Sequence, residues 1–198
     1  MDPRAGVTPS IRNFAQAIDR QRQALERIPL LDAGRPDLVE AALALDHAEA
    51  AALALSAGDD LTAFAAAAGA VSIPVLRADV LAEELRIYES RSAGADAVVL
   101  RASAVPAQLL GRLVQAATST HMAACVACAN PEEIARAAAA RAPVIALEPN
   151  LLHLDVPPRT LVLALSFAPA VRGRADAALD QTLDGAAAFR RALSEEDD

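Results

Sequence analysis

The sequence lacks lysine: all 18 of its basic residues are arginine. Arginine stays protonated near neutral pH, so the chain can neither form a Schiff base nor use a lysine as a general acid. Tryptophan is absent too, and aromatic residues make up only 3% of the 198 residues, against 54% that are hydrophobic. Much of this hydrophobic content is alanine, which suits one domain of closely packed helices and strands.

An excess of positive charge is also missing, since the formal net charge is −8. Nucleic-acid binding needs a basic surface, so this balance argues against it. No apolar run approaches the ~18 residues of a membrane span, and Met1-Asp2-Pro3-Arg4 does not resemble a signal peptide. We therefore expect a cytoplasmic protein whose partner is a small-molecule substrate or ligand, with no nucleic acid and no membrane involved.

Cysteine is scarce, and its two copies, Cys125 and Cys128, stand in a Cys-x-x-Cys spacing. This spacing is compatible with two reduced thiols on a strand, with a redox pair or with half of a zinc site. A redox pair would stand at a helix N-terminus, and zinc would need two further ligands, of which only His121 is near. We expect reduced thiols, no metal and no cofactor.

Residues 72–100 predict a strand, a helix and a second strand. Two short apolar runs flank a segment whose apolar residues recur at helical spacing, and Gly94 follows that segment as a helix C-cap. Two buried strands joined by one helix form a parallel unit, because the crossover returns the chain to the same end of the sheet.

The same alternation continues along the chain. We expect a flexible arm over 1–10, a barrel domain over 11–193 with an extra N-terminal helix at 11–27, and an acidic tail over 194–198. The expected strands cover 28–32, 51–55, 72–76, 97–100, 122–128, 143–147, 160–167 and 175–179. Asn130, Pro131 and two following acids are a strong helix start, and the last helix is expected at 185–193.

Three segments carry a resemblance to a known family. Leu76-Arg77-Ala78-Asp79-Val80, the run from Gly94 to Leu100, and Glu148-Pro149-Asn150-Leu151 resemble indole-3-glycerol-phosphate synthase. The resemblance implies an α/β (β/α)8 TIM barrel over most of the chain. Such barrels typically need ~250 residues, and too few residues separate strands 7 and 8 for a helix. We expect that helix to be missing and an apolar stripe of strands to be exposed there, with homodimerisation through the gap as one consequence.

The family's catalytic groups do not carry over. The resemblance aligns the family's general-acid lysine with Ala78 and its strand 5 glutamate with Ala127. Its phosphate-binding loop aligns with Asp180-Gln181-Thr182, where a carboxylate is expected to repel phosphate. Losing one general acid typically slows a reaction by a factor of ~10²–10⁴. The ancestral activity is therefore expected to be absent.

Barrel sites lie at the carboxyl ends of the strands, where several polar residues of this chain are expected. Glu148 is the first candidate for an acid or base, because an apolar strand precedes it. Arg77 and Asp79 form either a catalytic ion pair or a structural salt bridge. The candidate catalytic residues are Glu148, Asp79 and Arg77, and the candidate substrate-binding residues are Asp32, Arg101, Ser103, Cys125 and Asn150. His153 and Asp155 are either a proton-transfer pair or part of a solvated loop.

Two classes of function remain open. The first is a repurposed enzyme, with lyase, dehydratase or cyclase chemistry on an unphosphorylated, largely apolar small molecule. The second is a non-catalytic protein that binds a ligand or stabilises a partner enzyme. A cavity of roughly 300 Å³ or more that faces Glu148 or Asp79 would favour the enzyme.

Overall fold

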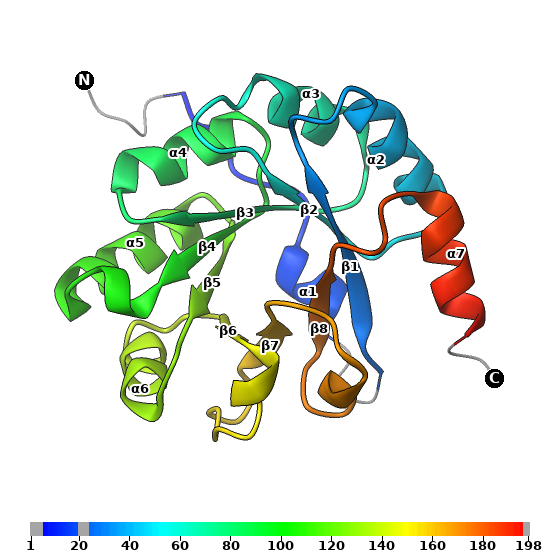
Figure 1. Cartoon of the computed structure of the whole chain (residues 1–198). Coiled ribbons are helices and arrows are strands. Elements are labelled where there is room, and N and C mark those ends of the chain that lie inside the picture. The colour runs from blue at the N-terminus through cyan, green and yellow to red at the C-terminus, as the bar shows by residue number, and fades with distance from the viewer. Residues whose placement is uncertain (1–5, 20–23, 196–198) are drawn as a thin grey trace.

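Short apolar strands pair in parallel, in chain order, and close into a barrel of eight strands. The computed structural model describes residues 6–19 and 24–195, and Figure 1 shows the helices arranged around the ring of strands. The strands are β1 (Glu26–Asp32), β2 (Leu53–Ser56), β3 (Val75–Leu81), β4 (Ala97–Arg101), β5 (Ala123–Ala127), β6 (Val144–Leu147), β7 (Leu161–Ala164) and β8 (Ala177–Asp180). The expected (β/α)8 barrel is confirmed.

The helices are α1 (Phe14–Ile18), α2 (Leu38–His47), α3 (Thr62–Ala70), α4 (Glu84–Ser92), α5 (Ala107–Ser119), α6 (Pro131–Ala139) and α7 (Ala186–Ser194). Three short 3₁₀ turns complete the elements: η1 (Ala102–Ala104), η2 (Pro149–Leu151) and η3 (Pro169–Val171). The start of α6 is as expected, because the Asn130 side chain accepts a hydrogen bond from the Glu133 backbone N–H.

The buried side chains form two layers. One fills the barrel and the other lies between the strands and the outer helices. The filling of the barrel is rich in small residues, including Ala54, Ala97 and Ala146. Successive side chains of a strand point to opposite faces, so this division assigns each strand position to the interior or the outside.

Helix α1 closes the amino-terminal end of the barrel, where it lies across the opening in Figure 1. Phe14 and Ile18 are both buried in the interior layer and fill space that the alanines leave. The expected helix over 11–27 is wrong in length. Asn13 caps α1 at one end, Asp19 is already extended, and Glu26 pairs with Ala177 as part of β1. Residues 20–23 of the expected helix lie outside the described residues.

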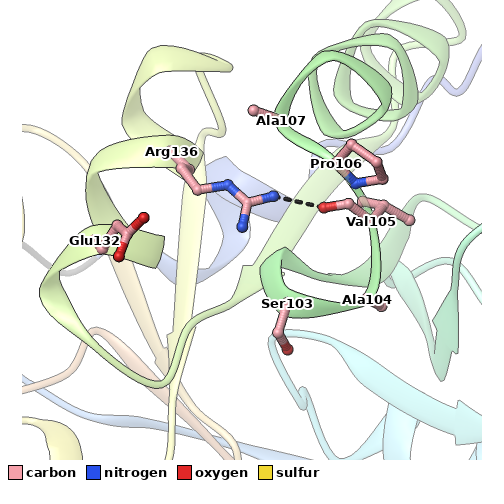
Figure 2. A pocket seen from close by; sticks show the side chains of 7 residues that line it. All are labelled: Ser103, Ala104, Val105, Pro106, Ala107, Glu132 and Arg136. Atoms are coloured by element: carbon pink, nitrogen blue, oxygen red, sulfur yellow. Dashed lines mark hydrogen bonds between the residues drawn. The ribbon is translucent and has the colours of Figure 1, made fainter.

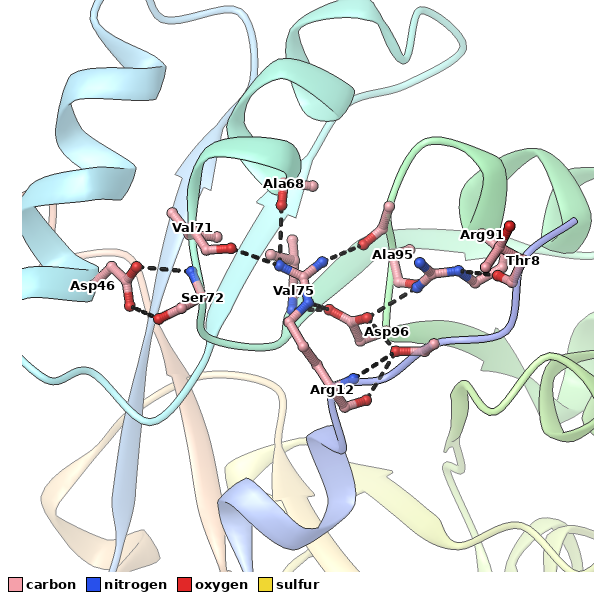
Figure 3. Close-up of polar contacts among 12 residues, drawn as sticks. Thr8, Arg12, Asp46, Ala68, Val71, Ser72, Val75, Arg91, Ala95 and Asp96 are labelled. Carbon is pink, nitrogen blue, oxygen red and sulfur yellow. Dashed lines mark hydrogen bonds and ion pairs between the residues drawn. The ribbon is translucent and has the colours of Figure 1, made fainter.

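The segment before α1 is held in place. The Ser10 hydroxyl donates a 2.5 Å hydrogen bond to the buried Asp96 carboxylate, and Arg91 bonds to the Thr8 carbonyl oxygen (Figure 3). The expected flexible arm over 1–10 is therefore wrong for residues 8–10, while residues 1–5 lie outside the described part of the chain. None of the helices in the described ranges is long and apolar enough to span a bilayer.

The side of the barrel formed by β6, β7 and β8 carries no long helix. The expected absence of a helix between β7 and β8 is confirmed, and the fully described connection from β6 to β7 likewise contains only η2. The expected exposed stripe is wrong, however. Leu147, Val162 and Ala178 point outward and are buried, because the two connections fold over them and contribute the buried Leu152 and Val171. Homodimerisation through the gap stays a prediction, without this stripe to support it.

Strand β3 continues beyond its expected end at residue 76. Its pairing with β4 shifts between Arg77 and Val80, so one irregularity lies in the segment that was expected to be a loop. Arg77 lies on the outside of the barrel and Ala78 on the inside. This shift decides which polar residues of β3 can reach the mouth of the barrel.

Candidate functional site

The mouth of the barrel, at the carboxyl ends of the strands, carries a ring of inward-facing positions. Each of these positions lies two residues beyond a side chain of the interior layer, or belongs to that layer itself. The ring consists of Asp32, Ser56, Ala78, Arg101, Ala127, Glu148, Leu165 and Gln181. From β3 to β8 apolar and polar positions alternate around the ring, so the apolar side chains at the ends of β3, β5 and β7 are separated by polar ones.

Arg101 and Glu148 are the two charged groups of the mouth without a hydrogen-bond or ion-pair partner among the described residues. Both are exposed, and neither side chain forms a hydrogen bond or an ion pair with any other residue of the described ranges. A guanidinium and a carboxylate that face one opening without structural partners are free to contact a ligand. They are the members of the expected site that the structure places most favourably.

Asp32 and Ser56 lie side by side, because they are register partners at the ends of β1 and β2. Asp32 Oδ1 accepts a 2.7 Å hydrogen bond from the Gly34 backbone N–H, which fixes the carboxylate at the start of the following turn. The Ser56 hydroxyl lies 3.5 Å from the Leu31 carbonyl oxygen. Strand β2 was expected to end at residue 55, so Ser56 was missed.

Arg77 and Asp79 do not face the mouth. Arg77 Nε lies 2.9 Å from Asp79 Oδ2, and its Nη1 donates to the Ser90 hydroxyl of α4 at 2.9 Å. Asp79 in turn accepts from the backbone N–H groups of Ala57 and Gly58. The pair therefore holds the turn after β2 against β3 and α4. These contacts are those of a structural salt bridge, the alternative to a catalytic ion pair.

Cys125 lies inside the barrel, fully buried and below the mouth. Burial raises the pKa of its thiol to about 12, so the thiolate that a nucleophile requires does not form near neutral pH. Cys128 belongs to the outer layer, and both cysteines are free thiols. The two sulfurs thus stand on opposite faces of β5, which does not suit a redox pair or a shared zinc ion.

Asn150 and His153 lie on the connection after β6. His153 Nδ1 is 2.9 Å from the Asn150 carbonyl oxygen, and the Asn150 side chain is exposed. His153, Asp155 and Arg174 line a cavity of about 350 Å³ outside β6 and β7. His153 and Asp155 therefore lie on the flank of the barrel, outside the ring of inward-facing positions.

Ser103 lies in η1, just outside the mouth. It lines a cavity of about 590 Å³ together with residues of the connection after β4 and with Glu132 and Arg136 of α6 (Figure 2). Glu132 and Arg136 were not predicted, because no pattern in the sequence distinguishes them from ordinary exposed helix residues. Neither Glu148 nor Asp79 lines any of four cavities, of about 350 to 590 Å³, that the described residues form.

A closed (β/α)8 barrel with this order of motifs invites comparison with known proteins. The family model of indole-3-glycerol phosphate synthase matches residues 7–162. The chain belongs to the indole-3-glycerol phosphate synthase family.

Relatives in the indole-3-glycerol phosphate synthase family agree with this assignment. The synthase of Chlorobium phaeovibrioides is 32% identical over 171 residues, which are 79% of this chain and 66% of that protein. The synthase of Laribacter hongkongensis is 30% identical over 87% of this chain and 71% of that protein. The chain thus spans about two thirds of the length of the first of these relatives.

Solved structures support the fold at lower identity. An orotidine 5'-phosphate decarboxylase from Pyrococcus horikoshii superposes with a TM-score of 0.65 at 12% identity, covering 85% of this chain and 98% of that one. At this identity the likeness establishes the barrel and nothing about the reaction.

Two alanines of the mouth stand where the sequence resemblance placed catalytic groups of the indole-3-glycerol phosphate synthase family. The position aligned with the general-acid lysine, Ala78, faces inward, and so does Ala127, which aligns with the strand 5 glutamate. The expected repulsion of phosphate by Asp180 is wrong, because this side chain points outward and forms a 2.6 Å ion pair with Arg27. Its other oxygen binds the Thr182 backbone N–H and hydroxyl.

Proposed function

We propose that this member of the indole-3-glycerol phosphate synthase family is a lyase-type enzyme for an unphosphorylated, largely apolar small molecule. The observation that carries the proposal is the pair of exposed, unpartnered charges, Arg101 and Glu148, at the mouth of the barrel. The buried charges Arg77, Asp96 and Asp180 are all paired within the fold, whereas these two charges are exposed at the mouth and have no partner in the described ranges. Barrel enzymes bind their substrates at this end of the strands.

The two charges have different roles in the proposed site. Arg101 stays protonated, so it holds an anionic group such as a carboxylate and fixes the orientation of the substrate. Glu148 can take up and release a proton, which elimination and ring closure both require. Asp32 and Ser56 offer further hydrogen bonds, while Ala127 and Leu165, one on each side of Glu148 in the ring, offer apolar contacts.

The absence of phosphate from the substrate is supported by the residues after β8. The backbone N–H and hydroxyl of Thr182, which could donate to a phosphate, are both used by Asp180, at 2.9 and 2.6 Å. The first four residues after β7, Leu165-Ser166-Phe167-Ala168, include no glycine that would bring backbone N–H groups close to a phosphate at the mouth. A lysine is absent from the whole sequence.

A second candidate is a barrel that binds a ligand without converting it, or that stabilises a partner enzyme. Two observations favour it. Ala78 and Ala127 put no ionisable group at positions that resemble the family's acid-base positions. In addition, neither Glu148 nor Asp79 lines any of the four cavities described above. The cytoplasmic location expected from the sequence belongs to both candidates, and the two free thiols agree with a reducing compartment.

A turnover assay separates these candidates. The purified protein is given the ring-closing substrate of the family's synthases, with and without its phosphate, and indole fluorescence is followed. Turnover of the phosphate-free form, lowered about 10²–10⁴-fold by Glu148→Gln, supports the proposal. The matched control is Glu195→Gln, which changes an exposed acid at the C-terminal end of α7 and should leave the rate unchanged.

Other results of this assay count against the proposed enzyme. Efficient turnover of the phosphorylated form would show that the protein has the activity of the family's synthases, and it would overturn the proposal. No turnover of either form, together with binding that Arg101→Gln weakens, would favour the ligand-binding protein. Arg190→Gln is the matched control for Arg101, since Arg190 is exposed on the outer helix α7 and is not one of the ring positions.

A further inference from the structure

The cavity beside the mouth, between η1, the start of α5 and α6, differs from the proposed active site. Its lining combines Ser103, the backbone of residues 104–107, Glu132 and Arg136, and its volume is about 590 Å³. Figure 2 shows α6 on one side and η1 with the start of α5 on the other. The cavity therefore sits on the rim of the barrel, outside the ring of inward-facing positions.

The Arg136 guanidinium carries more hydrogen-bond donors than the neighbouring residues offer acceptors. One terminal nitrogen, Nη2, donates to the Val105 carbonyl oxygen at 2.5 Å. Its Nε is buried and has no hydrogen-bond partner, the one such side-chain atom recorded in the described part of the chain. In Figure 2 the remaining terminal nitrogen points into the space between α6 and η1. A buried donor without an acceptor is unfavourable, so it calls for a water or a ligand.

The start of α5 adds further donors on the same side. Helix α5 has 13 residues, and its N-cap residue is Pro106, which offers no side-chain acceptor. The first backbone N–H groups of a helix have no partner within the helix, and they carry partial positive charge. Arg136 and the start of α5 thus present donors to one cavity, while the Ser103 hydroxyl points away from Arg136 (Figure 2).

The rest of the lining limits what can bind. Glu132 contributes a negative charge at the α6 side, which disfavours a dianion such as phosphate. Val105, Pro106 and Ala107 provide an apolar wall beside the donors. We propose that this cavity is a second binding site, which takes a small apolar molecule with a single carboxylate, held by Arg136 and the start of α5.

The experiment is an NMR titration of the ¹⁵N-labelled protein with benzoate. Its neutral analogue benzamide and inorganic phosphate serve as comparisons. We expect saturable shifts of the residue 104–107 amides and of the Arg136 Nε–H signal with benzoate, and slower solvent exchange of that Nε–H. Benzamide should bind at least about tenfold more weakly, since it lacks the charge that Arg136 recognises.

Two exposed residues supply variants that leave the fold intact. Ser103→Ala should leave benzoate binding almost unchanged, because its hydroxyl points away from Arg136, and Glu132→Gln should strengthen binding, because a repelling carboxylate is removed. Arg190→Gln, on α7, should change nothing. The proposal is overturned if benzoate leaves the Arg136 Nε–H unchanged, which would mean that only water fills the cavity. It is also overturned if phosphate binds as well as benzoate, or if Glu132→Gln does not strengthen benzoate binding.

Discussion

Arg12, in the segment before α1, and Asp96, just before β4, form a buried ion pair with Arg12 Nε 2.7 Å from Asp96 Oδ2. The guanidinium of Arg12 also donates to the carbonyl oxygens of Ala68, Val71 and Gly94 (Figure 3). Asp96 accepts further bonds from Ser10, Arg91 and the Val75 backbone N–H. One carboxylate therefore joins the N-terminal segment to the amino ends of β3 and β4.

Replacing Asp96 by asparagine should destabilise the protein strongly. The carboxylate is fully buried, and its loss leaves Arg12 and Arg91 with their charges largely enclosed. Breaking a buried ion pair from one side costs about 3–5 kcal/mol, and the partial exposure of the two arginines puts the expected loss near the lower limit. Urea unfolding measures this difference.

The matched control for that variant is Asp37→Asn. Asp37 forms a comparable ion pair with Arg35 at 2.6 Å, but on the surface. Its replacement should leave the urea midpoint almost unchanged, since exposed pairs contribute little. Equal losses for the two variants would show that the Asp96 cluster does not hold the N-terminal segment.

Phe14→Ala should remove the closure of the barrel. Phe14 is 1% exposed and packs into an interior that is lined by small residues, so no neighbour can fill the space it leaves. Truncating a buried phenylalanine typically costs about 3–5 kcal/mol. Ile11→Ala, three residues earlier and 99% exposed, is the control, and its unfolding free energy should stay within about 0.5 kcal/mol of the wild type.

The order of strands and helices could be predicted because each apolar run is short and each helix has its own periodicity and caps. The inward or outward direction of a strand residue could not. A strand buried on both faces shows no alternation of polar and apolar residues, so Ser56 and Gln181 gave no sign that they face the mouth. The shift in β3 after Arg77 had no sequence signal either, and Arg77 itself faces outward through its regular pairing with the outer-layer Val98.

The expectations for the gap failed for a different reason. The sequence shows that too few residues separate β7 and β8 for a helix, but it does not show what covers the strands instead. Leu152 and Val171 do so, from connections that have no regular period. The unpartnered state of Arg101 and Glu148 is likewise a property of three-dimensional packing, because any arginine or glutamate at a strand end could have been paired.

Arg77→Met tests whether this residue stabilises the fold or takes part in catalysis. Its side chain is 2% exposed and holds Asp79, Ser90 and the Gly58 carbonyl oxygen. We expect a loss of about 3 kcal/mol in unfolding free energy, because Asp79 loses its partner while partly buried. Arg112→Met, on the surface of α5, should cost far less. If Arg77→Met instead keeps its stability and loses turnover, the structural role is wrong.

The two cysteines should make the protein less stable in alkali. Burial raises the pKa of both thiols from 9.0 to about 12. Above 9.0 the unfolded chain releases these protons while the folded chain keeps them, so the free energy of unfolding falls as the pH rises towards about 12. Below 9.0 both states hold the protons, and the thiols contribute no pH dependence.

The absence of lysine makes this effect unusually easy to isolate. Between 9.0 and about 12 the thiols share the titration range with a single tyrosine, since every basic side chain is an arginine. Urea unfolding of the wild type and of a Cys125→Ala/Cys128→Ala variant, followed across this range, should give two curves that diverge. The fully buried Cys125 should contribute the larger part, up to about 1.4 kcal/mol per pH unit. Parallel curves would show that the thiols ionise in the folded state, and rapid alkylation of the native protein by iodoacetamide would confirm that result.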